Sequence, residues 1–330
     1  MELRGRALYN LLRMNWQRNP SLAIKEWQVA NLRDQSTPQL FEQLKSWGIG
    51  CDTPTFRAYA QECDSPEDLA DLFTEADTPN EIHEQIYLLL FELWRRELPE
   101  KQTLSIFCDE LDQLIDFFDR DANVVDEKIE ESLIALEDIL DESVDAGLQP
   151  QEALRLANEF CAHDIETFLY DYISHKIDSD QELQASEMID GFYDYVKDPR
   201  WFDFLRVRVF SKTHTSEFDP ALSRLIESLQ ENPELDLAME TAAFLVHEGS
   251  SEQFSETIKL CLELMQTEED FQQLLAIVAD YHDCLDQTEQ LSSIEELFKR
   301  RSTRDLNEPL NQADHDLSAF KLLFKPLITP

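Results

Sequence analysis

The stretch Leu104–Val144, LSIFCDELDQLIDFFDRDANVVDEKIEESLIALEDILDESV, decides the fold, because its apolar residues recur every three or four positions. The recurring residues are Leu104, Phe107, Leu111, Leu114 and Phe118, followed by Val125, Ile129, Leu133, Leu136, Leu140 and Val144. An α-helix turns once in about 3.6 residues, so each set forms a single apolar stripe along one helix face. We therefore predict two long amphipathic helices, over about 101–119 and 124–146.

The same helical spacing runs through most of the chain, without a convincing alternation of period two that would favour strands. Glycine is scarce, with only six in 330 residues. Sheet proteins need many turn positions with positive φ, and phosphate-binding loops need clustered glycines. The sequence therefore predicts an all-α fold and excludes P-loop and Rossmann enzymes.

Helix starts are marked by a hydroxyl residue followed by proline, which suits an N-cap and the first helical position. These pairs are Thr37-Pro38, Thr53-Pro54, Ser65-Pro66 and Thr78-Pro79. Ser65 with Asp68, and Thr78 with Glu81, also have the spacing of capping boxes. The N-terminal region is therefore predicted to be a set of short helices. Longer helices are predicted at about 78–98, 150–177 and 181–197.

Beyond residue 218 the predicted helices follow a regular rhythm, with a start about every 17 residues. The predicted starts lie near 218, 234, 251, 268, 288 and 305. Two-helix hairpins at this spacing are in the range of tetratricopeptide-like repeats, but the small-residue columns of that repeat are absent. We predict stacked helical hairpins, arranged as an α-solenoid or as several bundles. The predicted regions are an N-terminal bundle at 1–98, a central acidic and aromatic-rich region at 99–212, and repeat-like hairpins at 213–330.

The formal net charge is −41, and it is distributed unevenly. Residues 1–60 hold eight Lys and Arg against five Asp and Glu, whereas residues 61–330 hold twenty against sixty-four. Residues 109–145 alone carry fifteen carboxylates, opposed by Arg120 and Lys128. Such a surface repels a phosphate backbone and attracts basic proteins. The predicted partner-binding carboxylates are Asp126, Glu127, Glu130, Glu131, Glu137, Asp138, Asp141 and Glu142.

Aromatic residues concentrate in residues 160–210, which hold eleven of the thirty-three in the chain. Tyr and Trp combine apolar area with a polar tip, which suits protein interfaces. The predicted partner-binding aromatics are Tyr170, Tyr193, Tyr195 and Trp201. A helix-packing core is the alternative for this region, and it is the favoured interpretation for Phe168, Tyr172 and Phe192.

No spacing in the chain supports catalysis or metal binding. The densest cluster of His and carboxylates, Glu159, His163, Asp164 and Glu166, is predicted to lie on the 150–177 helix, with Glu159 and His163 on one face. It lacks the Glu-x-x-His of di-iron bundles and the His-Glu-x-x-His of zinc proteases. Asp109-Glu110-Leu111-Asp112 lacks the fifth-position acid of terpenoid enzymes, having Gln113 there. We expect no catalytic residue, cofactor or metal.

The six cysteines are far apart and include no Cys-x-x-Cys, which favours reduced thiols in the cytoplasm. The longest apolar run, Ile86–Phe91, is too short to cross a bilayer, so no membrane partner is expected.

Residues 37–63 resemble a bacterial helix-turn-helix, with Gly48-Ile49-Gly50 in the turn and Thr55-Phe56-Arg57-Ala58-Tyr59 in the second helix. The resemblance implies that Thr55, Arg57 and Gln61 would face a DNA major groove. The unit also falls within the only net-positive part of the chain, so a nucleic-acid partner is not expected to bind outside residues 1–60.

The charge, the aromatics and the missing catalytic spacings together favour a non-catalytic helical interaction protein, namely a scaffold, an adaptor or an escort chaperone. Its partner would be a basic or partly unfolded protein. Two alternatives stay open, a DNA-binding regulator acting through residues 37–63 and an unrecognised all-α enzyme.

Overall fold

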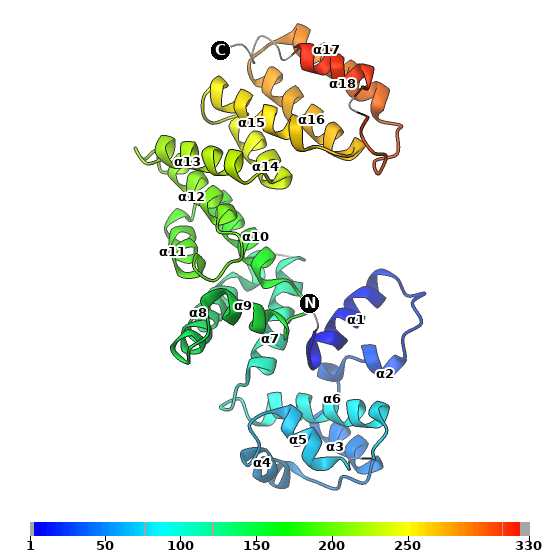
Figure 1. The fold of residues 1–330 in the computed structure, drawn as a ribbon. Helices are drawn as coiled ribbons and strands as arrows, with labels where there is room; N and C mark the ends of the chain where they lie inside the picture. Colours follow the sequence, from blue (N-terminus) through cyan, green and yellow to red (C-terminus); the bar gives the residue numbers. More distant parts are fainter. Residues whose placement is uncertain (1–2, 76, 121, 312, 324–330) are drawn as a thin grey trace. The chain divides into compact units, whose positions relative to one another are not determined.

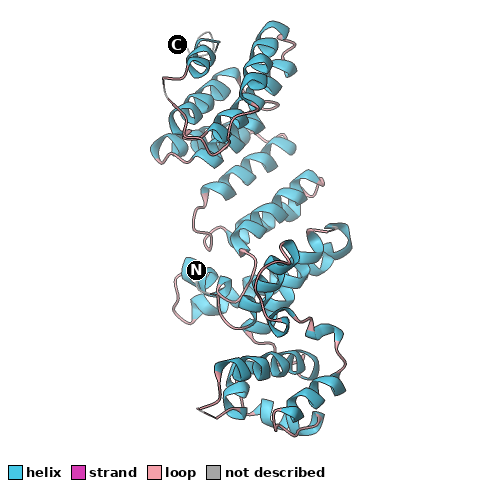
Figure 2. Ribbon diagram, turned by 90° about the vertical axis from the view of Figure 1, so that its right-hand side faces the viewer, coloured by secondary structure: helices cyan, strands magenta, loops and turns pink. Residues whose placement is uncertain are grey.

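The computed structural model describes residues 3–323 apart from Ala76, Asp121 and Gln312. The chain is 72% helical, with 18 α-helices and no strand among the described residues. Figures 1 and 2 show helices joined by loops throughout. The predicted all-α fold is therefore confirmed.

The chain divides into two compact units. The first unit comprises Met1–Asp171 with Asp194–Lys197, and the second comprises Tyr172–Tyr193 with Asp198–Pro330. The three regions suggested by the sequence stay a prediction.

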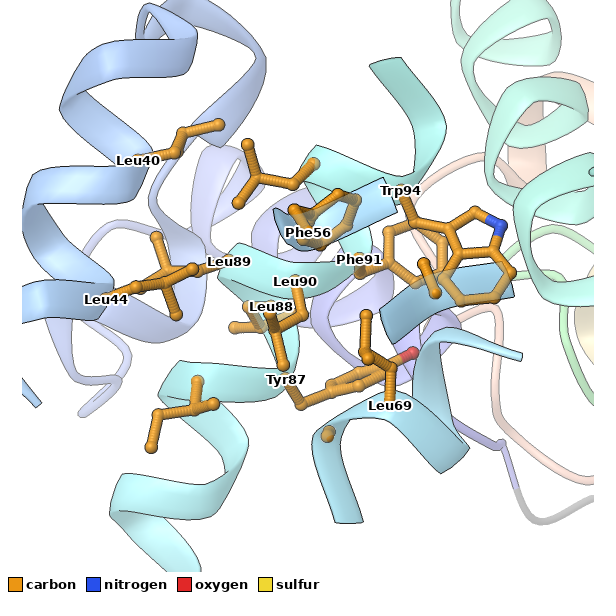
Figure 3. Packing of buried hydrophobic residues seen from close by; sticks show 14 of the residues in the cluster. Leu40, Leu44, Phe56, Leu69, Tyr87, Leu88, Leu89, Leu90, Phe91 and Trp94 are labelled. Carbon is orange, nitrogen blue, oxygen red and sulfur yellow. The ribbon is translucent and has the colours of Figure 1, made fainter. Parts of the chain in front are cut away.

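The described residues of the first unit form nine complete α-helices, a 3-10 turn and the first half of a tenth helix. They are α1 (Arg6–Arg18), α2 (Glu26–Val29), η1 (Leu32–Asp34), α3 (Thr37–Ser46), α4 (Thr53–Gln61), α5 (Pro66–Phe73), α6 (Asn80–Glu97), α7 (Leu104–Phe118), α8 (Ala122–Asp145), α9 (Pro150–Asn158) and α10 (Ile165–Asp178). Helix α6 packs against α3, α4, α5 and η1. Its nine consecutive residues Ile86–Trp94 are all buried, because neighbours cover it on every side. Figure 3 shows Leu40, Leu44, Phe56 and Leu69 from those neighbours in this core.

The helix caps of this unit confirm one predicted start and correct three. Ser65 caps α5, since its hydroxyl accepts a hydrogen bond from the Asp68 amide. Helices α3 and α4 are instead capped one residue earlier, by Ser36 and Asp52, so that the Thr-Pro pairs occupy the first helical turn. The predicted Thr78 cap is wrong: its hydroxyl accepts from the Glu75 amide, outside α6.

The predicted 150–177 helix is wrong, because the chain leaves the helix between α9 and α10. At the break, side chains accept the hydrogen bonds of the backbone amides. The Asp112 carboxylate accepts from the amides of Ala162 and His163, and Asn158 Oδ1 accepts from the Ile165 amide. The predicted shared helix face of Glu159 and His163 is therefore wrong as well.

In the second unit, the part of the chain that the structure describes forms the rest of α10 and eight further helices. They are α11 (Glu182–Phe192), α12 (Arg200–Lys212), α13 (Phe218–Glu231), α14 (Leu235–Leu245), α15 (Ser251–Leu264), α16 (Glu268–Cys284), α17 (Thr288–Arg301) and α18 (His315–Leu323). Each of the helices α11 to α18 packs on a neighbour in the chain, and contacts of α13 with α15 and of α14 with α16 join successive pairs. This is the hairpin stacking that the sequence rhythm predicts.

Two boundaries in this unit differ from the prediction. The predicted 181–197 helix ends at Phe192. The residues 194–197 belong to the first unit, where the Tyr195 hydroxyl donates to Asp141 and the Lys197 amide donates to Glu166. The predicted helix start near 305 is also wrong. Residues 306–310 pair with the backbone around the start of α16 instead, through Glu268 N to Glu308 O at 2.9 Å and Leu310 N to Gln266 O at 2.7 Å. The starts of α13 to α17 agree with the prediction to within one residue.

Candidate functional site

The outer face of α8 is the predicted acidic surface. Val125, Ile129, Leu133, Leu136 and Leu140 are buried, and α8 packs against α7 and α9. The outer face of α8 lies away from these buried residues, and its positions follow one another at steps of four and three residues. Its members are Glu127, Glu131, Ile134, Asp138, Asp141 and Asp145, and all six are exposed. Ile134 is 62% exposed, so an apolar side chain stands in the middle of the carboxylates.

Most of the exposed carboxylates of α8 have no counter-charge. Glu127, Glu131, Asp138 and Glu142 make no hydrogen bond or ion pair with the described part of the chain. Burial and the charges of Asp141 and Asp138 raise the pKa of the neighbouring Glu137 carboxyl. Mutual repulsion of this kind is relieved when a cation approaches. Three of the predicted carboxylates, Asp126, Glu130 and Glu137, are only half-exposed.

The four predicted aromatic anchors divide between the two units. Tyr195 is buried in the first unit, where its hydroxyl donates to Asp141, and burial and this hydrogen bond raise the pKa of the phenol. Tyr193 belongs to the second unit, where its hydroxyl donates to Asp203 Oδ1 at 3.1 Å and its ring lies 4.9 Å from the Arg206 guanidinium.

The other two anchors, Tyr170 in the first unit and Trp201 in the second, are half-buried. Phe168, Tyr172 and Phe192 lie in the core, as the core interpretation predicts.

The predicted helix-turn-helix corresponds to α3 and α4 joined by a turn at Gly48, whose φ is +85°. Thr55 and Gln61 are exposed on α4. The Arg57 guanidinium, however, lies 2.6 Å from Glu100 Oε1 in an ion pair within the unit. This ion pair is exposed, with 41% of the Arg57 side chain accessible, and the DNA-binding role of these residues stays a prediction.

A buried polar seam between α1 and α7 escaped the sequence reasoning. Its members are Arg6 and Asn10 on α1, Asp109 and Asp112 on α7, and Arg33 in η1. Asn10 Nδ2 donates to Asp109 Oδ1 at 2.9 Å and to Asp112 Oδ2 at 3.2 Å. Arg6 Nε lies 3.4 Å from Asp109 Oδ1, and Arg33 donates to Asp109 Oδ2 at 2.5 Å.

Asp109 is the centre of this seam, with only 3% of its surface exposed. Burial alone would raise the pKa of its carboxyl, but the charges of Arg6 and Arg33 and the bond from Asn10 hold that pKa below its usual value. Asp109 is therefore a buried carboxylate that keeps its charge.

The seam continues to His163, which follows α9 at the helix break. His163 Nδ1 lies 3.0 Å from Asp112 Oδ1, and Nε2 lies 3.6 Å from Asp116 Oδ1. Burial disfavours the imidazolium, but the hydrogen bond with Asp112 and the charges of Asp112 and Asp116 raise the pKa of His163 above its usual value. The sequence signal for the seam was the pair of stripes Arg6/Asn10/Arg13 and Asp109/Asp112/Asp116, each with helical spacing.

A cavity of about 540 Å³ opens at the end of the seam. Its lining includes Arg13, Trp16, Arg33, Gln113, Phe117 and Arg120. It therefore collects three arginines in a strongly acidic protein.

The described residues contain no group of three or more His, Cys, Asp or Glu placed to hold a metal ion. Within the same part of the chain, no helix is both long and apolar enough to cross a bilayer. All six cysteines are free. No protein-family model, curated protein or solved structure matches this chain.

Proposed function

We propose that this chain is a non-catalytic protein-interaction module that binds a basic segment of another protein through the outer face of α8. One observation carries the proposal: exposed carboxylates without internal counter-charges surround the exposed Ile134 on that face. The exposed Ile134 gives this face an apolar contact point between the charges of Glu131 and Asp138.

The chemistry of this face supports a basic partner with an apolar side chain at its centre. Carboxylates at Glu127, Glu131 and Asp138 attract Lys and Arg over long range and raise the rate of encounter. Ile134 adds a contact that requires an apolar side chain at the centre of the partner segment. An amphipathic basic helix has both features, since its cations flank an apolar stripe. A scaffold, an adaptor and an escort chaperone would each use such a surface, and free, mostly buried thiols suit a cytoplasmic setting.

The test is titration of a fluorescent amphipathic peptide of Lys and Leu into the full chain, followed by anisotropy. The variant E127Q/E131Q/D138N/E142Q removes four unpaired, exposed charges from α8. The matched control E252Q/E256Q/E295Q/E296Q removes four exposed carboxylates from α15 and α17 of the second unit, with the same change in net charge.

We expect the α8 variant to weaken peptide binding about tenfold or more, because each desolvated charge pair contributes to affinity. The control should bind like the unmodified chain, and added salt should weaken the unmodified chain more than the α8 variant. An equal loss in both variants would show that net charge, and not this face, attracts the peptide.

A further inference from the structure

The cations of the first sixty residues are almost all engaged within the first unit. Six of the eight form ion pairs: Arg4 with Glu159, Arg6 and Arg33 with Asp109, Lys25 with Glu81, Lys45 with Glu42, and Arg57 with Glu100. The remaining two, Arg13 and Arg18, make no ion pair or hydrogen bond through their side chains with the described residues. Arg18 is exposed at the end of α1, whereas Arg13 is half-buried in the wall of the 540 Å³ cavity.

The cavity lies between matching faces of two helices. Arg13, Trp16 and Gln17 share a face of α1 at steps of three and four, and Gln113 and Phe117 share a face of α7. Trp16 is 37% exposed and Phe117 is 42% exposed, so each aromatic ring keeps a free surface at the cavity. The lining thus offers cations and flat apolar surfaces together.

Among the described residues, neither acid of the lining, Asp34 or Asp116, forms an ion pair with Arg13. Asp34 accepts from Asn31 Nδ2 at 2.8 Å, and Asp116 lies 3.6 Å from the His163 imidazole. Burial and the like charge of Arg6 lower the pKa of Arg13, and the charges of Asp109 and Asp116 offset this only in part. An anion in the cavity would relieve this repulsion.

We propose that this cavity binds a small anion carried on an aromatic ring, either a carboxylate or a phosphate monoester. Arg13 is the anchoring donor, since a guanidinium presents two parallel N–H groups to such oxygens. Arg120, which lies 5.9 Å from the Phe117 ring, supplies a second cation at the cavity. Trp16 and Phe117 stack against the ring of the ligand.

The test is isothermal titration of the full chain with four probes: phenyl phosphate, benzoate, inorganic phosphate and phenol. Phenyl phosphate and benzoate compare a phosphate with a carboxylate on the same ring. Inorganic phosphate has the anion without the ring, and phenol has the ring without the anion. The variants are R13Q, R120Q and the matched control R18Q, which changes an exposed, unpaired arginine on the same helix.

We expect saturable binding of phenyl phosphate or benzoate that exceeds binding of inorganic phosphate and of phenol. R13Q should weaken it about tenfold or more, the cost of a lost charge-assisted hydrogen bond, while R18Q leaves it unchanged. If R13Q does not fold, weaker binding by R120Q together with unchanged binding by R18Q supports the proposal. The proposal would be overturned if neither phenyl phosphate nor benzoate bound saturably, or if phenol bound equally well. It would also be overturned if R18Q lost as much affinity as R13Q and R120Q.

Discussion

Replacing Asp109 by Asn tests whether the seam between α1 and α7 holds the first unit together. The substitution keeps the size of the side chain and one carbonyl oxygen, so Asn10 still has an acceptor. It removes the negative charge opposite Arg6 and Arg33, whose side chains are only 7% and 14% exposed. Two nearly buried guanidinium groups would then face a neutral amide.

The size of the effect follows from these contacts. A hydrogen bond to a charged group contributes about 1.5–3 kcal/mol, and Asp109 accepts two from arginines. Removing one partner of a buried ion pair costs about 3–5 kcal/mol, because the other charge stays buried without compensation. We therefore expect D109N to lower the free energy of unfolding of the first unit by about 3 kcal/mol or more.

The assay is urea unfolding followed by circular dichroism, with hydrogen exchange of α1 amides as a local readout. D190N is the matched control, because Asp190 pairs with Arg206 at 2.8 Å but is 69% exposed. Exposed pairs contribute at most about 1 kcal/mol, so this control should change little. The reasoning would be refuted if D109N lowered the free energy of unfolding no more than D190N and left hydrogen exchange of the α1 amides unchanged.

Three further predictions test other parts of the fold. Because the pKa of His163 is raised above 6.5 in the folded chain, its contribution to stability is complete below about pH 6.5 and is lost as the pH rises through the folded pKa. The stability difference between the unmodified chain and H163Q, measured by urea unfolding across this range, should therefore shrink toward alkaline pH. E268Q removes the charge opposite the buried Arg301, so we expect a loss of about 2 kcal/mol and faster hydrogen exchange in α18. W94A should cost about 3–5 kcal/mol in the same urea assay, since Trp94 is fully buried in the core around α6.

Local periodicity predicted most of the fold because it reports which face of a helix is buried. It located α7 and α8 and the starts of α13 to α17, where one apolar stripe meets its chain neighbours. It failed at the break between α9 and α10, because the Asp112 carboxylate that holds the amides of Ala162 and His163 lies about fifty residues away in the chain. Tertiary contacts of this kind leave no local period.

The candidate sites also differ in whether local periodicity or tertiary contacts determine them. Helical spacing around buried Ile129 and Leu133 is enough to place Glu127, Glu131 and Asp138 on the outer face of α8. The seam and the arginine-lined cavity depend on the pairing of α1 with α7, two helices about a hundred residues apart in the chain. Their stripes of opposite charge were visible, but no sequence rule states which stripes meet.

Charge counts along a sequence also say little about which charges are free. Residues 1–60 are net positive, which made them the natural place to look for a nucleic-acid contact, yet Arg57 pairs with Glu100 and Arg6 and Arg33 pair with Asp109. Phosphate binding needs cations that are free to replace counterions, so Arg57 would have to leave Glu100 before it could contact DNA. Six of the eight N-terminal cations pair with carboxylates of the first unit, whereas Glu127, Glu131 and Asp138 on the outer face of α8 form no ion pair with the described residues.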